Sequence, residues 1–468
     1  MRARSPLTLT PASGPEPAEA PDDGSVAPEA LPLHALLLVA ALAAGVADQG
    51  AYYRAGQWPV AVLLVAAVVT ALRARPRSEQ DWGFSPSWAI TALAAWALVR
   101  AAVAGDVSAA LPAVALLAAF VAVVGVVRRV DDVGALASAA VAVGCLVALS
   151  GWVGVVWRIA PWAGVNDGLW RAATSLTYAN AAGALCALLV PLALVRLVGR
   201  PSPPLASAGA CLLLLGVAAT LSRGGLLAAA TGVVVLAVLL GGRAVARAAL
   251  APTVGAGIAC AGLIPSMQAG SPSRPLLAVL ALGAGLAAAA GLPILSDLGH
   301  GGARLGLVAV AAVVAGVMGT QGAGALTAIG DSRLTVSSPD RGHALHSSLK
   351  VIARHPIVGV GPGQAVLSWT RPDGRSLVAK YAHNEYVQVL VELGIVGLGL
   401  LLVMLGSIAA GLRRAAGRPV DVWAGGAAGL AGLCVGSAFD FLWHVPVIPL
   451  FGALLIGVAL PPTRKEHQ

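Results

Sequence analysis

Charged residues are scarce in this sequence: they make up 11% of its 468 residues, whereas hydrophobic residues make up 58%. The mean hydropathy is +0.84. Water does not solvate a chain of this composition as a globule, and such values are typical of proteins that cross a membrane many times. The shortage of charge therefore excludes a soluble domain and predicts a polytopic membrane protein.

Cysteine pairs and metal-binding motifs are missing too. The 5 cysteines lie singly in apolar stretches without CxxC spacing, so the sequence indicates neither a disulfide framework nor a cysteine metal site. His343, His346 and His355 lie near one another, but a catalytic zinc site usually has three protein ligands, often including a carboxylate, and HExxH is absent. No glycine is followed by Lys-Ser/Thr, which excludes a P-loop. We expect no metal and no cofactor.

The net charge of +9 does not indicate a nucleic-acid-binding surface. The basic residues are scattered over many short loops, and no nucleic-acid-binding motif occurs. Residues 1–30 are rich in Pro, Ala, Asp and Glu and contain no apolar run. This composition predicts a disordered cytoplasmic tail rather than a signal peptide.

Apolar stretches long enough to cross a bilayer recur along the chain. A spanning helix needs roughly 20 mainly apolar residues, a criterion that gives about fourteen segments, with about twelve or thirteen as alternatives because Ala- and Gly-rich spans are weak signals. We therefore predict an all-α transmembrane helix bundle of about 12–14 spans. The segments begin near Leu31, Trp58, Ser87, Ala109, Gly134, Tyr178, Leu205, Gly224, Ala246, Leu276, Arg304, Asn384, Val420 and Asp440.

Arginine clusters predict which loops are cytoplasmic, because Lys and Arg are enriched in short cytoplasmic loops. Alternate loops carry clusters such as Arg128 with Arg129 and Arg413 with Arg414, which places both termini in the cytoplasm. The predicted divisions are a cytoplasmic tail (residues 1–30), N-terminal spans (31–177), central spans (178–320), an extracytoplasmic catalytic loop (321–383), C-terminal spans (384–460) and a cytoplasmic tail (461–468).

The long outer loop contains one clear helical pattern. Leu345, Leu349 and Ile352 are spaced four and three apart within residues 340–354, which predicts a short amphipathic helix that lies flat on the bilayer. Pro356 ends this pattern and begins a turn-rich stretch.

A polar motif occurs where the span near Gly224 begins. Ser222 is a good N-terminal cap, and Arg223 then lies at the positive end of the helix dipole. A helix N-terminus with an arginine can bind phosphate oxygens. A snorkelling arginine at the membrane interface fits the motif equally well.

A second polar motif begins the span near Asn384. Asn384, Gln388 and Glu392 are spaced by four and form one polar stripe that enters the membrane. Glu392 is either a functional group facing the bundle interior or a buried acid hydrogen-bonded to a neighbouring helix. His383 precedes the stripe at the interface, where a neutral imidazole can accept a proton near pH 7.

These motifs and several others follow one another in a set order. They are Tyr178-Ala-Asn180 opening a span that reaches Pro191, Ser222-Arg-Gly224, the loop from His355 to Gly363, His383-Asn384 with Glu392-Leu-Gly394, and Phe439-Asp440 with His444 and Pro446. Their order and spacing over roughly residues 178–460 resemble the O-antigen ligase and polymerase family of polytopic bacterial membrane glycosyltransferases.

The resemblance implies a metal-independent enzyme of the bacterial inner membrane that moves a glycan from a polyprenyl diphosphate to an acceptor hydroxyl on a glycan, lipid or protein. The family's functional positions match Arg223, Arg341 and His383, with Arg333 as a competing match for the loop arginine. Paired arginines suit a diphosphate leaving group, and His383 suits a general base or an acceptor-positioning group. The remaining predicted substrate-binding residues are Asn384, Tyr381, Glu392, Asp440 and His444.

Other functions remain open at this point. A transporter or flippase for lipid-linked sugars would also have many spans and basic residues, but transporters usually place polar groups at the bilayer midplane and often contain internal repeats. Here polar groups gather in one loop and at helix ends. A peptidoglycan polymerase type of glycosyltransferase fits the His-Asn and Ser-Arg-Gly motifs less well. Between polymerase and ligase, the compact outer loop favours a polymerase.

Overall fold

The computed structural model describes residues 30–74, 87–199, 203–298, 316, 323–333, 339–371, 374–416 and 420–460. The expected N-terminal tail up to residue 29, the expected span near Arg304 and the C-terminal tail lie outside these ranges.

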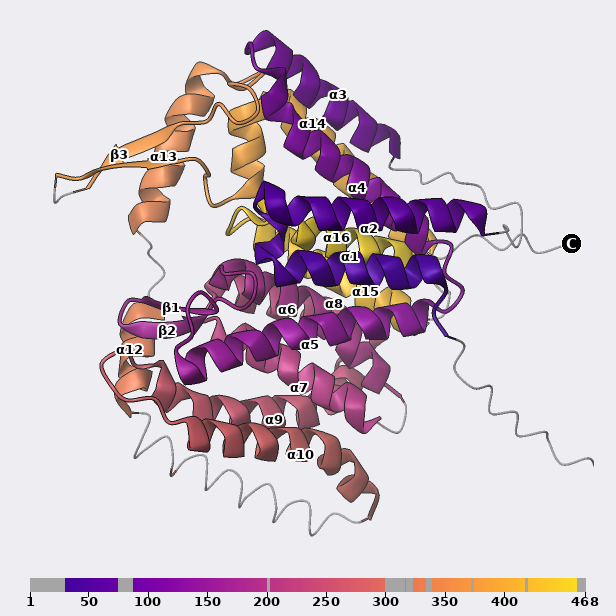
Figure 1. The fold of residues 1–468 in the computed structure, drawn as a ribbon, viewed down its shortest axis with the longest axis vertical. Helices are drawn as coiled ribbons and strands as arrows, with labels where there is room; N and C mark the ends of the chain where they lie inside the picture. Colours follow the sequence, from indigo (N-terminus) through magenta and orange to yellow (C-terminus); the bar gives the residue numbers. More distant parts are fainter. Residues whose placement is uncertain are drawn as a thin grey trace, which may run out of the picture. The chain divides into compact units, whose positions relative to one another are not determined.

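The chain folds as an all-α transmembrane helix bundle, as the sequence predicts (Figure 1). Within the described ranges, 8 helices are long and apolar enough to cross a membrane, and shorter apolar helices lie between them. The apolar helices are α1 (Leu33–Ala47), α2 (Arg54–Arg73), α3 (Ser87–Val103), α4 (Leu111–Val127), α5 (Val133–Trp157), α6 (Ala179–Leu194), α7 (Pro204–Ala219), α8 (Arg223–Leu240), α9 (Gly242–Met267), α10 (Pro275–Leu298), α14 (Glu385–Arg414), α15 (Val420–Ser437) and α16 (Val447–Ala459).

Most helices begin within a few residues of their predicted starts, but α16 does not. The sequence places the last span near Asp440, whereas α16 begins at Val447. A turn and the short 3-10 helix η4 (Leu442–His444) occupy the intervening residues. Pro446 lies at the N-terminal cap position of α16, where its missing N–H is not needed. Asp440 therefore lies in a connection between helices rather than within a span.

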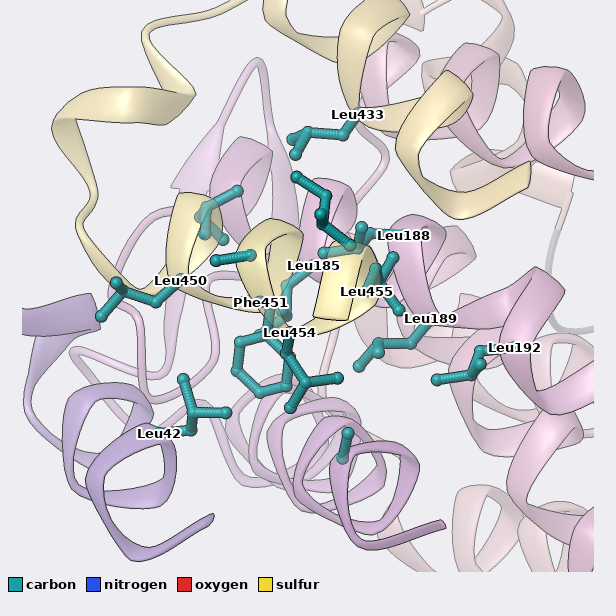
Figure 2. Packing of buried hydrophobic residues seen from close by; sticks show 14 of the residues in the cluster. Leu42, Leu185, Leu188, Leu189, Leu192, Leu433, Leu450, Phe451, Leu454 and Leu455 are labelled. Atoms are coloured by element: carbon teal, nitrogen blue, oxygen red, sulfur yellow. The ribbon is translucent and has the colours of Figure 1, made fainter. Parts of the chain in front are cut away.

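Helix α6 forms the centre of the apolar core. Every residue from position 181 to 194 is buried, as expected for a helix that is apolar on all sides. Figure 2 shows leucines of α6, including Leu185 and Leu188, close to Phe451 and Leu455 of α16. Such close packing supplies the van der Waals contacts that hold helices together where lipid provides no hydrophobic driving force. The start of α6 is thereby fixed in position.

Two short antiparallel hairpins interrupt the helical pattern. The first joins β1 (Ala163–Asn166) to β2 (Leu169–Ala172), and the second joins β3 (Leu367–Thr370) to β4 (Ser376–Ala379). Neither hairpin is predicted from the sequence. Both lie in connections between helices, where four-residue strands leave little periodic signal.

The long loop contains α12 (Ala323–Arg333) and α13 (Pro339–Arg354), followed by the second hairpin. Helix α13 confirms the amphipathic helix predicted for residues 340–354, and it packs against β3 and α14 (Figure 1). Leu345 and Leu349, from its predicted apolar stripe, are exposed.

Candidate active site

Asp440 is the centre of a polar cluster between the end of α15 and the start of η4. Its side chain is almost fully buried, with 3% relative exposure. The hydroxyl of Tyr178 donates to the carboxylate at 2.8 Å, and Asn180 Nδ2 donates to Oδ2 at 2.5 Å. The backbone N–H of Phe441 donates to Oδ1 at 2.9 Å. Three donors from two distant parts of the chain therefore hold this carboxylate in one orientation.

Two basic side chains complete the cluster. Arg341 Nη2, from α13, lies 3.3 Å from Asp440 Oδ2, and His383 Nδ1 lies 3.1 Å from Oδ1. Burial alone would raise the pKa of Asp440. The hydrogen bond and charge of His383, the charge of Arg341 and the hydrogen bond from Tyr178 outweigh that effect and lower the pKa of this carboxyl. Asp440 is therefore an anion that binds two basic groups at once.

The contact with Asp440 assigns the tautomer of His383. A carboxylate only accepts hydrogen bonds, so Nδ1 carries the hydrogen that faces Asp440. In the neutral imidazole, Nε2 is then the nitrogen with a free lone pair. The His383 side chain is 32% exposed, so a proton donor can approach it. His383 is therefore suited to act as a base through Nε2 while the buried Asp440 carboxylate holds its Nδ1–H.

The residues that follow His383 support its backbone. His383 has a left-handed φ of 52°, and Asn384 caps α14 by accepting a hydrogen bond from the N–H of Val387 at 3.1 Å. Gln388 Oε1 accepts from the N–H of Ala382 at 2.8 Å. Two residues of the predicted polar stripe therefore fix the segment that presents the histidine.

Within the part of the chain that the structure describes, Glu392, the third residue of the stripe, does not bond to the segment that presents His383 but to Gln388 and Gly361. Its carboxylate accepts a hydrogen bond from Gln388 Nε2 at 2.7 Å. Its backbone oxygen accepts from the N–H of Gly361 at 2.9 Å. Glu392 thus connects α14 to the turn-rich loop that follows α13.

That loop packs into a break in α14. Gly394 has φ 67° and ψ −168°, so the regular hydrogen-bond ladder stops there. The N–H of Ile395 donates to the carbonyl oxygen of Pro356 at 2.9 Å, and Trp96 Nε1 donates to that of Leu393 at 2.9 Å. Arg100 Nε donates to a loop carbonyl at 2.7 Å. Backbone groups released by the break are thereby paired, which a membrane interior requires.

A small hollow lies beside the cluster, with about 210 Å³ of empty space that includes open solvent. Arg341 and Asp440 line it together with residues of the first turn of α8. Ser222 caps that turn by accepting from the N–H of Gly225 at 3.1 Å. Arg223 is the first residue of α8. The lining residues are Asn180, Ala184, Ser222, Gly224, Gly225, Arg341, Gly436, Phe439, Asp440 and Leu442.

Aromatic rings cover another side of His383. The ring of Phe441 lies 5.1 Å from His383 and 4.8 Å from Tyr381, centroid to centroid. Tyr381 lies 4.2 Å from His444, whose Nδ1 is 3.3 Å from Glu385 Oε1. Tyr381 and His444 are therefore neighbours of the cluster through Phe441.

Two other sequence-predicted features lie apart from these contacts. Arg333 ends α12, and its side chain lies outside the described part of the structure. His343 stacks on Trp369 of β3 at a centroid distance of 6.5 Å. Among the described residues, no group of three His, Cys, Asp or Glu side chains has a metal-binding arrangement.

A comparison with protein-family models adds independent information. The family model described as O-antigen ligase matches residues 208–402. This segment of the chain is therefore similar to the O-antigen ligase family. The matched segment covers less than half of the chain, and it contains Arg223, Arg341 and His383. No curated protein matches the chain. An O-antigen ligase family member is a membrane glycosyltransferase-type enzyme, which agrees with the helix bundle.

Asp440 and its two neutral donors lie outside the segment matched by the O-antigen ligase model. Tyr178 and Asn180 precede it, and Asp440 follows it. Tyr178 and Asn180 belong to a motif of the sequence, but neither is predicted there as a site residue. Their signal was the polar Tyr-Ala-Asn triplet at the start of an otherwise apolar span.

His444 gives the protein a pH-dependent contact with Glu385. Burial lowers the pKa of His444, but the charge and hydrogen bond of Glu385 outweigh burial and raise it above its usual value. The resulting stability is fully present below the unfolded pKa, about 6.5, and is lost as pH rises through the folded pKa. We expect thermal unfolding in detergent to show this alkaline loss in wild type and not in His444→Gln. Parallel pH profiles for the two proteins would contradict it.

Proposed function

We propose that this protein transfers a glycan from a polyprenyl diphosphate carrier to an acceptor hydroxyl on the outer side of the bacterial inner membrane. The observation that carries the proposal is the cluster in which Asp440 binds both Arg341 and His383, beside the first turn of α8. The family match supports the reaction class.

Groups that line the hollow suit the phosphate oxygens of the donor. Arg341 borders the hollow, and the capped first turn of α8 contributes the positive end of a helix dipole. Arg223 begins the same helix. We assign to Arg223 and Arg341 the binding of the diphosphate oxygens and the stabilisation of the negative charge that develops as the sugar leaves. In this proposal no metal ion is needed for that role.

His383 suits the acceptor side of the reaction. The acceptor hydroxyl oxygen forms a new bond to the anomeric carbon, and the bond from that carbon to the diphosphate oxygen breaks. The electron pair leaves with the polyprenyl diphosphate, and His383 Nε2 takes the hydroxyl proton. Asp440 holds the imidazole in the required tautomer and stabilises its protonated form. Tyr381 and Asn384 orient groups around the histidine.

We further propose that the acceptor is a growing glycan, which would make the protein a surface polysaccharide polymerase. The outer loop carries two short helices, α12 and α13, and one hairpin, which supports an acceptor that needs no large docking surface. The similarity to the O-antigen ligase family favours the second candidate, a ligase that attaches a finished glycan to a lipid, wall polymer or protein.

One cellular experiment tests the reaction and separates the two candidates. Cells lacking this protein are complemented with wild type or with His383→Ala, and the surface and lipid-linked glycans are sized. We expect wild type alone to restore the glycans. Single repeats accumulating on the carrier identify a polymerase, whereas full-length glycan stranded on the carrier identifies a ligase.

A second histidine provides the control for that experiment. His346 is exposed on α13, and His346→Ala is expected to complement as wild type does. Glycans that are unaltered in cells lacking the protein would contradict the proposed transfer.

A further inference from the structure

Arg171, on strand β2, contacts both the cluster around Asp440 and the turn that leads into α8. Its Nε donates to the carbonyl oxygen of Thr220 at 2.8 Å, and its Nη2 donates to Asn180 Oδ1 at 3.1 Å. The planar guanidinium presents these two donors at a fixed angle. Arg171 precedes the segment that matches the O-antigen ligase model, so the match assigns it no role.

The contact with Arg171 determines how the amide of Asn180 is oriented. An arginine only donates hydrogen bonds and a carboxylate only accepts them. With its oxygen bound to Arg171, the amide must direct Nδ2 toward Asp440, where it donates to Oδ2 at 2.5 Å. The reverse orientation would place two donors together and two acceptors together. Arg171 thereby keeps Asn180 as a donor to the acid that binds His383.

The contact with Thr220 fixes the turn that leads into α8. Thr220 is fully buried, and Leu221 has a left-handed φ of 49°. Ser222, the capping residue, follows directly and donates its N–H to Thr220 Oγ1 at 3.3 Å. A bond from Arg171 to the Thr220 carbonyl therefore holds the backbone from which the first turn of α8 enters the hollow.

We propose that Arg171 is a positioning residue for glycan transfer, acting through Asn180 on Asp440 and His383. The inference rests on the proposed function. Arg171 makes one connection between the β1–β2 hairpin, the start of α6 and the start of α8, so the acid, its histidine and the diphosphate-binding turn keep one relative arrangement. Loss of Arg171 would displace these groups from that arrangement. Such a displacement, caused at a distance from the reacting atoms, lowers the rate of the chemical step more than it weakens donor binding.

The test uses full-length protein in proteoliposomes and, as donor, the lipid-linked glycan extracted from cells that lack the protein. Transfer is measured for wild type, Arg171→Ala, Asn180→Ala and the double variant. We expect Arg171→Ala to lower kcat by about 100-fold with a smaller change in KM for the donor. The double variant should transfer no more slowly than the slower single variant, since both changes interrupt one connection.

Two further variants make the interpretation specific. Arg171→Lys keeps the charge but not the planar pair of donors, and we expect it to be as slow as Arg171→Ala. Arg247 is exposed on α9 and bonds only within its own helix in the contacts described, so Arg247→Ala should retain the wild-type rate.

Several results would overturn the positioning role. They are a wild-type rate in Arg171→Ala, recovery of the rate by Arg171→Lys, additive losses in the double variant, or a loss that disappears when rates are expressed per folded molecule. Failure of wild type itself to transfer the glycan overturns the proposed function and this inference with it. The two kinds of failure are thus distinguished by the wild-type rate.

Discussion

Replacing Asp440 with asparagine is expected to lower the rate of glycan transfer by about 1,000-fold or more, because one substitution removes the partner of two functional side chains. The carboxylate now accepts hydrogen bonds from Tyr178, Asn180 and the backbone of Phe441 while it binds Arg341 and His383. An asparagine side chain has only one acceptor oxygen. Its NH2 group is itself a donor, so it cannot accept hydrogen bonds from the donors that now bind the second carboxylate oxygen.

The tautomer of His383 makes this substitution more severe than a loss of charge. If the new amide donates to Nδ1, the histidine proton moves to Nε2, and that nitrogen no longer accepts the hydroxyl proton. The rate is measured with the lipid-linked glycan that accumulates in cells lacking the protein. Asp106→Asn is a matched control, because Asp106 is exposed and its carboxylate binds Ser108. A rate for Asp440→Asn close to that of wild type would remove Asp440 from the mechanism.

Replacing Gly394 with alanine is expected to destabilise the protein by about 3 kcal/mol or more, because no side chain fits at the break in α14. A β-carbon there would lie 2.2 Å from the carbonyl oxygen of Ile357 and 2.5 Å from the nitrogen of Val358. Both are backbone atoms, so neither moves away alone. The residue also has a φ of 67°, which strains any L side chain.

The measurement is thermal unfolding of purified protein in detergent, together with the yield of monodisperse protein. Gly399 provides the control within the same helix, since a β-carbon at that position would meet nothing within 4 Å. Alanine at 399 should leave stability equal or slightly higher, because alanine is the better helix former. Equal stability of the two variants would show that the loop does not depend on the break.

Local patterns in the sequence were sufficient for much of the fold. Hydropathy located the apolar helices to within a few residues, and the four-and-three spacing of Leu345, Leu349 and Ile352 located α13. These features depend on contacts between near neighbours, so each is recorded in a short stretch of chain. The start of α16 was misplaced because Asp440 to His444 form a turn and a 3-10 helix, which have no strong periodic signal.

The candidate site illustrates the other case. Sequence reasoning and family resemblance selected Arg341, His383 and Asp440 separately, and the structure brings these three together. Tyr178, Asn180 and Arg171 were not predicted from the sequence as site residues. Each of these bonds to a residue from 9 to 262 positions away in the chain, a separation at which no short pattern records a partner.

The sequence by itself determined the class of protein, the apolar helices and the cap of α8. Lipid imposes length and hydropathy on every span, and a cap needs only residues three positions apart. Only the tertiary structure decided that Asp440 joins a histidine to an arginine, that Arg171 reaches the same cluster, and that a loop fills the break at Gly394. Those contacts arise when α6, α13, α14 and α15 pack together, and buried polar groups then bind whichever donors and acceptors the packing brings within reach.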